Sequence, residues 1–292
     1  MYTLALGDHT YSSWSLRGWL LFEKFDIPVN LRKAHLYLQE FQDLMADFSP
    51  AKTVPALLIE GQNQAMWDSF AIAETLHERH PDAGLWPEDA HTRALARTLT
   101  AEMHSGFVTL RDQCTMNLEY SYKDFPVDDD LQRDLDRLEQ IWAFALKSSN
   151  GPWLFGEYCV ADAFFAPVAS RVATYGLPVS DMAQSYVNQH LSDLSFRRWR
   201  AMGKAQNYVQ PVYQLDFAKT EWPGPRPMNA IAVTSGTPKN SLCPYSQKPV
   251  QSDSLAEIEG QTVGFCNTFC RDKSVADPQA WPSLMEMLKS CN

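Results

Sequence analysis

Strand-like and helix-like segments alternate through the first seventy residues, and this order constrains the fold more than any other feature of the chain. Residues 1–8 have the pattern of a first strand, and residues 11–27 continue as an apolar, helix-like run. A second strand-like segment, residues 56–59, leads through a turn into a helix-like segment at residues 70–76. Alternation of this kind predicts an α/β layer fold for residues 1–80.

Helical periodicity replaces this alternation after a breaker-rich linker at residues 79–89. One set of apolar residues recurs at steps of three and four, which is typical of a helix with one buried face: Leu131, Leu135, Leu138, Trp142 and Leu146. The stretch from Glu102 to Leu110 is expected in one long helix, and the polar residues 120–130 are expected to form a loop. We therefore predict an all-helical domain over residues 90–214.

Three prolines within residues 221–227 cannot continue a helix and favour an extended linker. The block that follows, residues 228–292, contains four of the six cysteines. Two strand-like runs flank Glu259-Gly260 there, as in a hairpin, and a helix is expected to follow and to end before Asp277. We predict a small α+β module for this block, because a chain of 292 residues has room for a third unit.

Charge and hydropathy exclude two classes of partner. The chain has 25 Lys and Arg against 35 Asp and Glu, a formal charge of −10, and no run of clustered cations, so we expect no nucleic-acid partner. No apolar run approaches the roughly 20 residues that a membrane-spanning helix needs. The first residues lack the positive flank and cleavage site of a signal peptide, and we expect a cytoplasmic location.

Three dipeptides occur in order in the first block: Ser12-Ser13, Val54-Pro55 and Asp68-Ser69. Their order and spacing resemble the glutathione-binding domain of the cytosolic glutathione transferases, and the resemblance covers residues 1–210. The paired serines are similar to the serine-type transferases, including the zeta class. The resemblance implies a thioredoxin-like domain that binds glutathione, followed by a helical domain.

The serine pair is the candidate catalytic element. A thiol becomes a useful nucleophile as the thiolate, and lowering its pKa by about two units needs about 2.7 kcal/mol of preference for the charged form. A hydroxyl donor and the amides of a helix N-terminus supply such a preference. The resemblance assigns this role to Ser12, with Ser13 as the next candidate. An ordinary helix N-cap is the alternative interpretation of both serines.

The same resemblance implies how the rest of glutathione is bound. The main chain of Val54, before Pro55, would pair with the cysteinyl group like an added strand. Asp68 would accept from the γ-glutamyl amino group, and Ser69 would donate to the γ-glutamyl carboxylate at a helix N-terminus. Lys52 would meet the glycyl carboxylate, although a solvated surface lysine is an equal alternative.

A second-substrate site is expected between the two domains. His104, Phe107 and Arg111 fall at helical spacing in a Glu-Met-His-Ser-Gly-Phe context that resembles bacterial members of the family. Arg111 would attract an anionic substrate and His104 would shuttle protons. A core stripe flanked by two surface polar residues is the alternative.

One segment of the helical block departs from the family pattern. Residues 155–162 resemble the capping box of the transferases, but Cys159 stands where a hydroxyl residue is usual. A thiol is a weaker cap than a hydroxyl. We expect Asp162 to cap the helix start and Cys159 to be a buried structural thiol.

These features predict a glutathione transferase that conjugates the glutathione thiolate to small electrophiles, as in detoxification. Two alternatives remain open: a glutathione-dependent isomerase, and a non-catalytic scaffold of the same fold that carries a metal-sensing or metal-binding tail. The resemblance also implies a homodimer. The electrophile itself is not specified by any motif.

The cysteines of the last block suggest a metal site. Cys243-Pro244-Tyr245-Ser246 resembles a monothiol glutaredoxin motif, but too few residues follow it for that fold. The spacing of Cys243, Cys266 and Cys270 resembles the small TRASH/YHS-type metal-binding modules instead.

Three thiolates suit zinc, and a bound metal helps a block with so small a core to fold. No histidine follows His190, so Cys291, an acidic residue or water would complete the ligand set. Three reduced, buried cysteines without a metal are the alternative.

Overall fold

The computed structural model describes residues 1–290. The chain forms two compact units, one built from residues 1–191 and 211–223 and the other from residues 192–210 and 224 onward. No helix within residues 1–290 is both long enough and apolar enough to cross a membrane.

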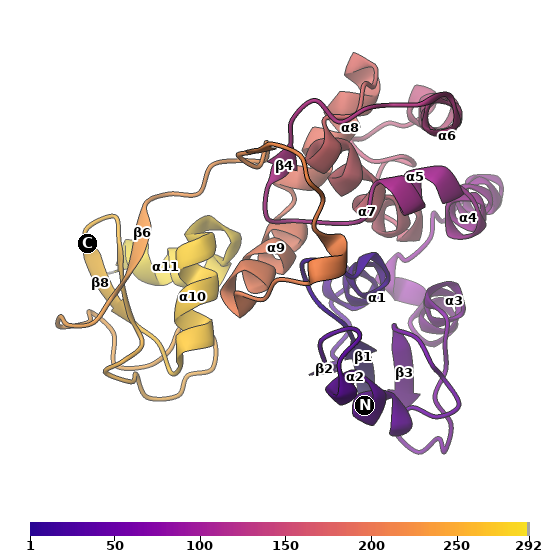
Figure 1. Ribbon diagram of the computed structural model, residues 1–292. Coiled ribbons are helices and arrows are strands. Elements are labelled where there is room, and N and C mark those ends of the chain that lie inside the picture. The colour runs from indigo at the N-terminus through magenta and orange to yellow at the C-terminus, as the bar shows by residue number, and fades with distance from the viewer. Residues whose placement is uncertain (291–292) are drawn as a thin grey trace. The chain divides into compact units, whose positions relative to one another are not determined.

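The first unit begins with a thioredoxin-like layer, as predicted (Figure 1). Its elements are β1 (Tyr2–Leu6), α1 (Ser13–Glu23), β2 (Asn30–Lys33), α2 (Gln39–Ala46), β3 (Ala56–Ile59) and α3 (Ser69–Arg79). The sheet has the order β2-β1-β3, with β2 parallel and β3 antiparallel to β1. An antiparallel bridge between Leu57 and Met66, with two backbone hydrogen bonds of 2.8 Å, extends the sheet beyond β3.

Alternation along the strands gives the sheet two buried faces. Ala5 and Ala56, which are paired in the register, pack with Leu44, Met45 and Phe48 from α2 and the residues after it. Because side chains alternate along a strand, Leu4 and Leu57 point to the opposite face, and both are fully buried. Covering of both faces explains why β1 and β3 carry apolar residues at successive positions, whereas β2 at the edge of the sheet is exposed.

The helical part of the first unit follows a short 3-10 turn at Pro81–Ala83. Its elements are α4 (Ala90–Ser105), α5 (Val108–Gln113), β4 (Ser121–Tyr122), α6 (Asp129–Lys147), α7 (Val160–Tyr175), α8 (Asp181–Ser192) and β5 (Lys219–Thr220). One bidentate ion pair, between Arg97 and Glu74, joins α4 to α3 of the thioredoxin-like layer, and another, between Arg137 and Glu102, joins α6 to α4.

One local expectation for this region was wrong and a second was incomplete. The single helix expected through Glu102 and Leu110 is two helices, because Gly106 is extended and Phe107 has the left-handed φ of 55°. The expected loop at residues 120–130 contains the two-residue strand β4, which pairs with β5 of the returning chain. A pairing with residues a hundred positions away leaves no trace in local periodicity.

The start of α7 is organised by Asp162, as expected from the capping-box resemblance. Its buried carboxylate accepts hydrogen bonds from the backbone N–H of Cys159 at 2.9 Å and of Leu154 at 3.1 Å. The hydroxyl of Tyr186 from α8 donates to the same carboxylate at 2.7 Å. Cys159 is buried, in agreement with a structural role. Asp162 therefore ties the loop before α7, the helix itself and α8 together.

The second unit combines the last helix of the helical block with the cysteine-bearing tail. Its elements are α9 (Leu194–Gln206), β6 (Ala230–Val233), β7 (Leu255–Ile258), β8 (Gln261–Gly264), α10 (Thr268–Ala276) and α11 (Pro282–Ser290). The strands form an antiparallel sheet in the order β6-β7-β8. The expected hairpin is present, and its turn residues Glu259 and Gly260 both have positive φ, the geometry that favours two-residue hairpins.

Packing within the second unit explains why α9 belongs to it. α9 and α10 lie side by side (Figure 1), and Ala201 of α9 is buried in the same core as Ile258, Phe265 and Leu284. Arg197 of α9 makes a bidentate ion pair with Asp277, at 2.7 and 2.8 Å, with both side chains largely buried.

We expect Asp162→Ala to lower the free energy of unfolding by about 3 kcal/mol or more. The substitution leaves three buried donors without an acceptor, and each costs about 1–3 kcal/mol. Chemical denaturation of the purified protein measures the change. Asp181→Ala, which removes an exposed carboxylate from the first turn of α8, should stay within about 0.5 kcal/mol of the wild type. Equal stability of the two variants contradicts the role given to Asp162.

Candidate functional site

A cleft of about 660 Å³ lies within the first unit, and it collects half of the residues that the sequence singled out for the glutathione and second-substrate sites. The lining comes from the start of α1, the loops before α2 and β3, α5 with the residues after it, and α7. The segment of residues 211–223, which follows α9 and belongs to the first unit, completes the lining. The polar and aromatic lining residues of the cleft include Tyr11, Ser12, Ser13, Trp14, Tyr37, Lys52, Arg111, Asp112, Arg171 and Tyr213, and Val54 lies beside them. Five of the expected site residues are among them: Ser12, Ser13, Lys52, Val54 and Arg111.

The hydroxyl of Ser12 is engaged by the helix that it caps. It donates to the hydroxyl of Ser15 at 2.8 Å and accepts from the backbone N–H of Ser15 at 3.2 Å. The Ser15 hydroxyl in turn accepts from the backbone N–H of Gly7 at the end of β1. Ser12 is 4% exposed, and its side chain thus has a structural function whatever else it does.

The hydroxyl of Ser13 faces a guanidinium instead. Its hydrogen-bond partner is Nη2 of Arg171, at the long distance of 3.5 Å. Ser13 is half-buried, whereas Arg171 is 4% exposed and reaches the cleft from α7. The cleft therefore contains a hydroxyl and a buried cation side by side.

Two further arginines lie close to this pair. Arg17 and Arg111 both contact the ring of Trp14, with guanidinium-to-centroid distances of 4.7 and 5.0 Å. Arg17 is 1% exposed, and its Nε and Nη1 have no hydrogen-bond partner in residues 1–290. Burial, followed by the neighbouring Arg171 and Arg111, lowers the pKa of Arg17 well below its ordinary value.

Burial likewise lowers the pKa of Arg171, to about 10, and the charge of Arg111 contributes to the shift. Within the described residues no carboxylate forms an ion pair with Arg17 or Arg171. Asp112 is the one carboxylate that lines the cleft, against the three cations Lys52, Arg111 and Arg171. The lining is therefore positive and suited to an anionic ligand.

Val54 lines the cleft, and its peptide bond with Pro55 is cis. The proline lies against α1, where a Cβ on Gly18 would come within 2.6 Å of the Pro55 Cβ. Only a residue without a Cβ permits this approach, so Gly18 sets the distance between α1 and the strand that begins at residue 56.

The third dipeptide starts α3, as expected, but its carboxylate is already bonded within the protein. One oxygen of Asp68 accepts from the backbone N–H of Phe70 at 2.9 Å, and the other lies 2.8 Å from Nε2 of His104. Ser69 is fully buried, and its hydroxyl has no partner among residues 1–290. Neither residue lines the cleft described above.

The expected second-substrate residues lie close together, since Nη1 of Arg111 donates to the backbone carbonyl of His104 at 3.3 Å, but they do not all line the cleft. Arg111 lines the cleft, while His104 is bonded to Asp68 and packs its ring against Trp14, Phe70 and Phe164. Phe107 is buried at the break between α4 and α5 and is not part of the lining.

Arg171 and Tyr213 are cleft residues that sequence reasoning missed. A cation inside the otherwise apolar run of α7 was the available signal for Arg171. Tyr213 carried no local signal, because it comes from the chain that returns after α9. Its ring lies 5.2 Å from that of Tyr11 and 6.4 Å from that of Tyr37, so the three tyrosines form an aromatic side of the cleft.

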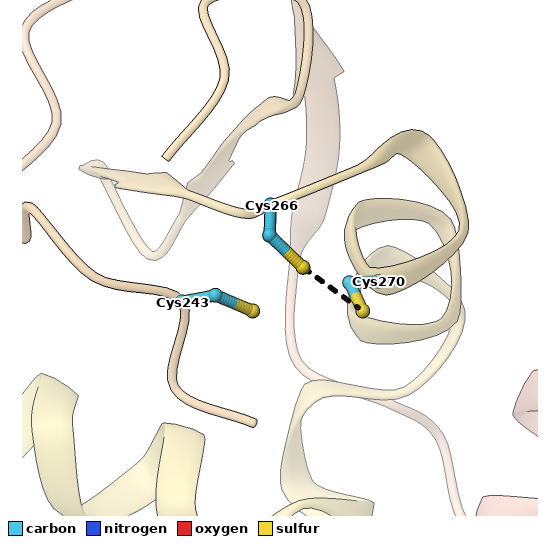
Figure 2. A group of neighbouring side chains, drawn as sticks. All are labelled: Cys243, Cys266 and Cys270. Atoms are coloured by element: carbon cyan, nitrogen blue, oxygen red, sulfur yellow. Dashed lines mark hydrogen bonds between the residues drawn. The ribbon is translucent and has the colours of Figure 1, made fainter. Parts of the chain in front are cut away.

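The cysteine cluster of the second unit has the geometry of a metal site (Figure 2). The Sγ atoms of Cys243, Cys266 and Cys270 all lie within 4.8 Å of one another, and those of Cys266 and Cys270 are 3.9 Å apart. A tetrahedral zinc with Zn–S bonds of about 2.3 Å separates its sulfurs by about 3.8 Å. The donor set therefore fits zinc, although the group has three members and Cys291 lies outside the described residues.

The surroundings of the three sulfurs favour thiolates in part. Burial alone raises the pKa of Cys243, but the backbone N–H groups of Ser246, Tyr245 and Cys266 outweigh it and bring the pKa to about 7. Burial raises the pKa of Cys270 to about 12, and the neighbouring sulfurs contribute. A divalent cation at the centre reverses the repulsion between thiolates, so the cluster is suited to binding a metal.

Comparison with known proteins agrees with the fold of the first unit. Residues 11–79 match the family "Glutathione S-transferase, N-terminal domain". The chain is 29% identical over 187 residues to the maleylacetoacetate isomerase of Rattus norvegicus, covering 61% of this chain and 82% of the relative. It is 41% identical over 69 residues to glutathione S-transferase Z1 of Arabidopsis thaliana, covering 24% and 28% of the two chains.

Solved structures of glutathione transferases are also similar to this chain. A glutathione transferase homolog from Burkholderia, solved with bound glutathione, is 25% identical, has a TM-score of 0.51 and covers 68% of this chain and 95% of its own. The glutathione transferase Omega 2S of Trametes versicolor, at 18% identity and a TM-score of 0.54 over 73% and 99% of the two chains, shares the fold. Together with the thioredoxin-like sheet, these similarities show that the chain has the glutathione transferase fold and that residues 11–79 are similar to the N-terminal domain of that family.

Proposed function

We propose that the chain is a glutathione-dependent transferase that joins the glutathione thiolate to small electrophiles. The observation that carries the proposal is the cleft, where the Ser12–Ser13 turn, Lys52 and the Val54 backbone are brought together. Relatives with this fold include a homolog solved with bound glutathione, and glutathione is the expected co-substrate here.

Glutathione would lie along the thioredoxin-like side of the cleft. Its cysteinyl backbone would pair with Val54, before the cis Pro55, and Lys52 would bind the glycyl carboxylate. The γ-glutamyl group would reach the N-terminus of α3, where the buried Ser69 hydroxyl has no other partner in the described residues. Asp68 would exchange its contact with His104 for the γ-glutamyl amino group.

The chemistry that the cleft supports begins with thiolate attack on an electrophilic carbon. When a leaving group departs, or a proton is added, glutathione stays bound to the product and the reaction is conjugation. When the substrate is an activated cis alkene, the adduct can rotate and expel the thiolate, which is isomerisation. Several relatives are named maleylacetoacetate isomerase, so isomerisation is the second candidate. The homodimer implied by the family stays a prediction.

Calorimetry with glutathione, followed by turnover assays, tests the proposal. We expect binding of one glutathione per chain and a product that contains glutathione when a chlorodinitrobenzene is supplied. Glutathione that is recovered unchanged while a cis enedione becomes trans indicates the isomerase instead. Absence of both binding and turnover contradicts an enzyme and leaves the scaffold alternative.

Gly18→Ala should weaken glutathione binding by about tenfold or more. The new Cβ overlaps the rigid ring of Pro55 and displaces the Val54 backbone, which loses its alignment with the cysteinyl group. Calorimetry measures the affinity, and circular dichroism checks that the variant is folded. Glu23→Ala, at the other end of α1, is the control and should bind like the wild type. A folded Gly18→Ala protein with unchanged affinity argues against this placement of glutathione.

We propose further that Cys243, Cys266 and Cys270 bind zinc as structural ligands of the second unit. The proposal is supported by the convergence of the three sulfurs and by the backbone donors that lower the pKa of Cys243. Zinc bound there would link the loop after β6, the end of β8 and the first turn of α10. The fourth position would be taken by water, by an acidic residue or by Cys291.

Reduced protein purified without chelator should contain about one zinc per chain by elemental analysis. Cys243→Ser should lose most of it and should lower the melting temperature, because metal binding contributes to folding. Cys159→Ser removes a buried cysteine outside the cluster and should keep the metal. Zinc-free wild type that remains zinc-free after reconstitution, with unchanged stability, contradicts the site.

A further inference from the structure

We propose that Arg171 is a catalytic residue that, together with Ser13, holds the glutathione thiolate. The inference rests on the proposed glutathione-dependent function and names the groups that would contact the sulfur. The proposal places a group that contacts the reacting sulfur on α7, in the helical part of the first unit. No sequence motif indicated a catalytic residue in this helix.

The two serines differ in what their hydroxyls are free to do. Ser12 donates its proton to Ser15 at 2.8 Å and accepts from the Ser15 backbone, and both bonds maintain the start of α1. The hydroxyl of Ser13 makes its hydrogen bond only to Arg171 within residues 1–290, at 3.5 Å, and it lines the cleft. Ser13 can therefore turn its proton toward a bound sulfur without breaking the helix cap.

Arg171 is fixed in place by the parts of its guanidinium that face away from Ser13. Nε donates to the carbonyl of Cys114 at 2.7 Å, and Nη1 donates to the carbonyl of Pro167 at 3.2 Å. Nη2 is left at the cleft, next to the Ser13 hydroxyl. A buried donor that is already oriented loses little freedom when it binds an anion, which is the arrangement that stabilises charge most effectively.

The charge around Arg171 is not balanced within the protein. The side chain is 4% exposed, and its described neighbours include the cation Arg111 but no carboxylate in ion-pair contact. Its pKa of about 10 keeps it protonated at neutral pH. Charged groups taken out of water are usually paired, so the site lacks one negative charge. A thiolate at Ser13 and Arg171 supplies that charge and is stabilised by it.

A purely structural role is the competing explanation, because Arg171 also joins the end of α5 to α7 through the Cys114 carbonyl. The two explanations differ in one measurable quantity, the pKa of bound glutathione. An opposite charge within about 4–6 Å lowers the pKa of an acid by about 1–3 units, whereas a structural contact leaves it unchanged.

The test is the pH dependence of thiolate ultraviolet absorbance in the glutathione complex and of kcat/KM, on the full chain. Arg171→Gln and Ser13→Ala should each raise the pKa of the bound thiol by about one unit or more, which at pH below that pKa means about tenfold less thiolate. Arg171→Lys should restore part of the shift. Glutathione affinity well below the thiol pKa should change little, because the neutral thiol form gains nothing from the charge of Arg171. Above the pKa of free glutathione the affinity should fall by about the same tenfold factor, since the thiolate is then the bound form in every variant.

Arg93→Gln is the matched control, since Arg93 also donates to two backbone carbonyls, those of Pro87 and Glu88, but lies outside the cleft lining. Its thiol pKa should equal that of the wild type. If Arg171→Gln does not fold, the thiol pKa is compared among Arg171→Lys, Ser13→Ala and Ser12→Ala. A thiol pKa that is raised in Ser12→Ala alone overturns the assignment.

Two further results also overturn it. One is a folded Arg171→Gln protein with an unchanged thiol pKa. The other is an Arg171→Gln protein whose thiol pKa is unchanged and whose KM is raised for a carboxylate-bearing electrophile but not for the methyl ester of that electrophile. This result would mean that Arg171 binds the second substrate and not the thiolate. A wild type that binds no glutathione refutes the proposed function as well, whereas normal binding and turnover with an unmoved thiol pKa refute only the role of Arg171.

Discussion

The close approach of α1 to Pro55 is the constraint on which the geometry of the cleft depends. Gly18 allows the helix to touch the proline ring, and this contact sets the position of the Val54 backbone relative to the Ser12–Ser13 turn. At its N-terminus the same helix is fixed to the end of β1 by the Ser12, Ser15 and Gly7 hydrogen bonds. The Val54 backbone and the Ser12–Ser13 hydroxyls are therefore both positioned by contacts with the rigid helix α1, which favours precise alignment of a ligand.

The helical part of the first unit contributes charge to this backbone frame. Arg111 from α5 and Arg171 from α7 both reach the cleft, and Arg17 of α1 is buried nearby with two of its nitrogens unbonded within the described chain. Placing three guanidinium groups so close together costs stability, because desolvation and mutual repulsion lower the pKa of two of them. Costs of this kind are typical of functional sites, where the ligand supplies the missing charge.

The second unit uses a different means of stabilisation. Its sheet and helices enclose a small core around Ile258, Phe265 and Leu284, and the buried ion pair between Arg197 and Asp277 joins α9 to the tail. The three sulfurs lie at the points where a loop, a strand end and a helix start meet, so a bound metal would add to the contacts that Tyr245 and Ser246 of the loop make with Ser274 and Cys266. Short units commonly need such a connection, because their cores bury too little apolar surface.

Local sequence determined the elements and the contiguous motifs of this protein, and tertiary structure decided how they are used. The Ser12-Ser13, Val54-Pro55 and Asp68-Ser69 pairs, the hairpin at Glu259-Gly260 and the Asp162 cap were predictable, because turn, cap and strand preferences act over a few residues. The break at Gly106–Phe107, the pairing of β4 with β5 and the union of α9 with the tail were not. Ser12 and Ser13 look alike in sequence, yet one hydroxyl serves the helix and the other faces Arg171, which lies 158 positions along the chain. Contacts at that separation arise from packing between elements, and no local pattern encodes them.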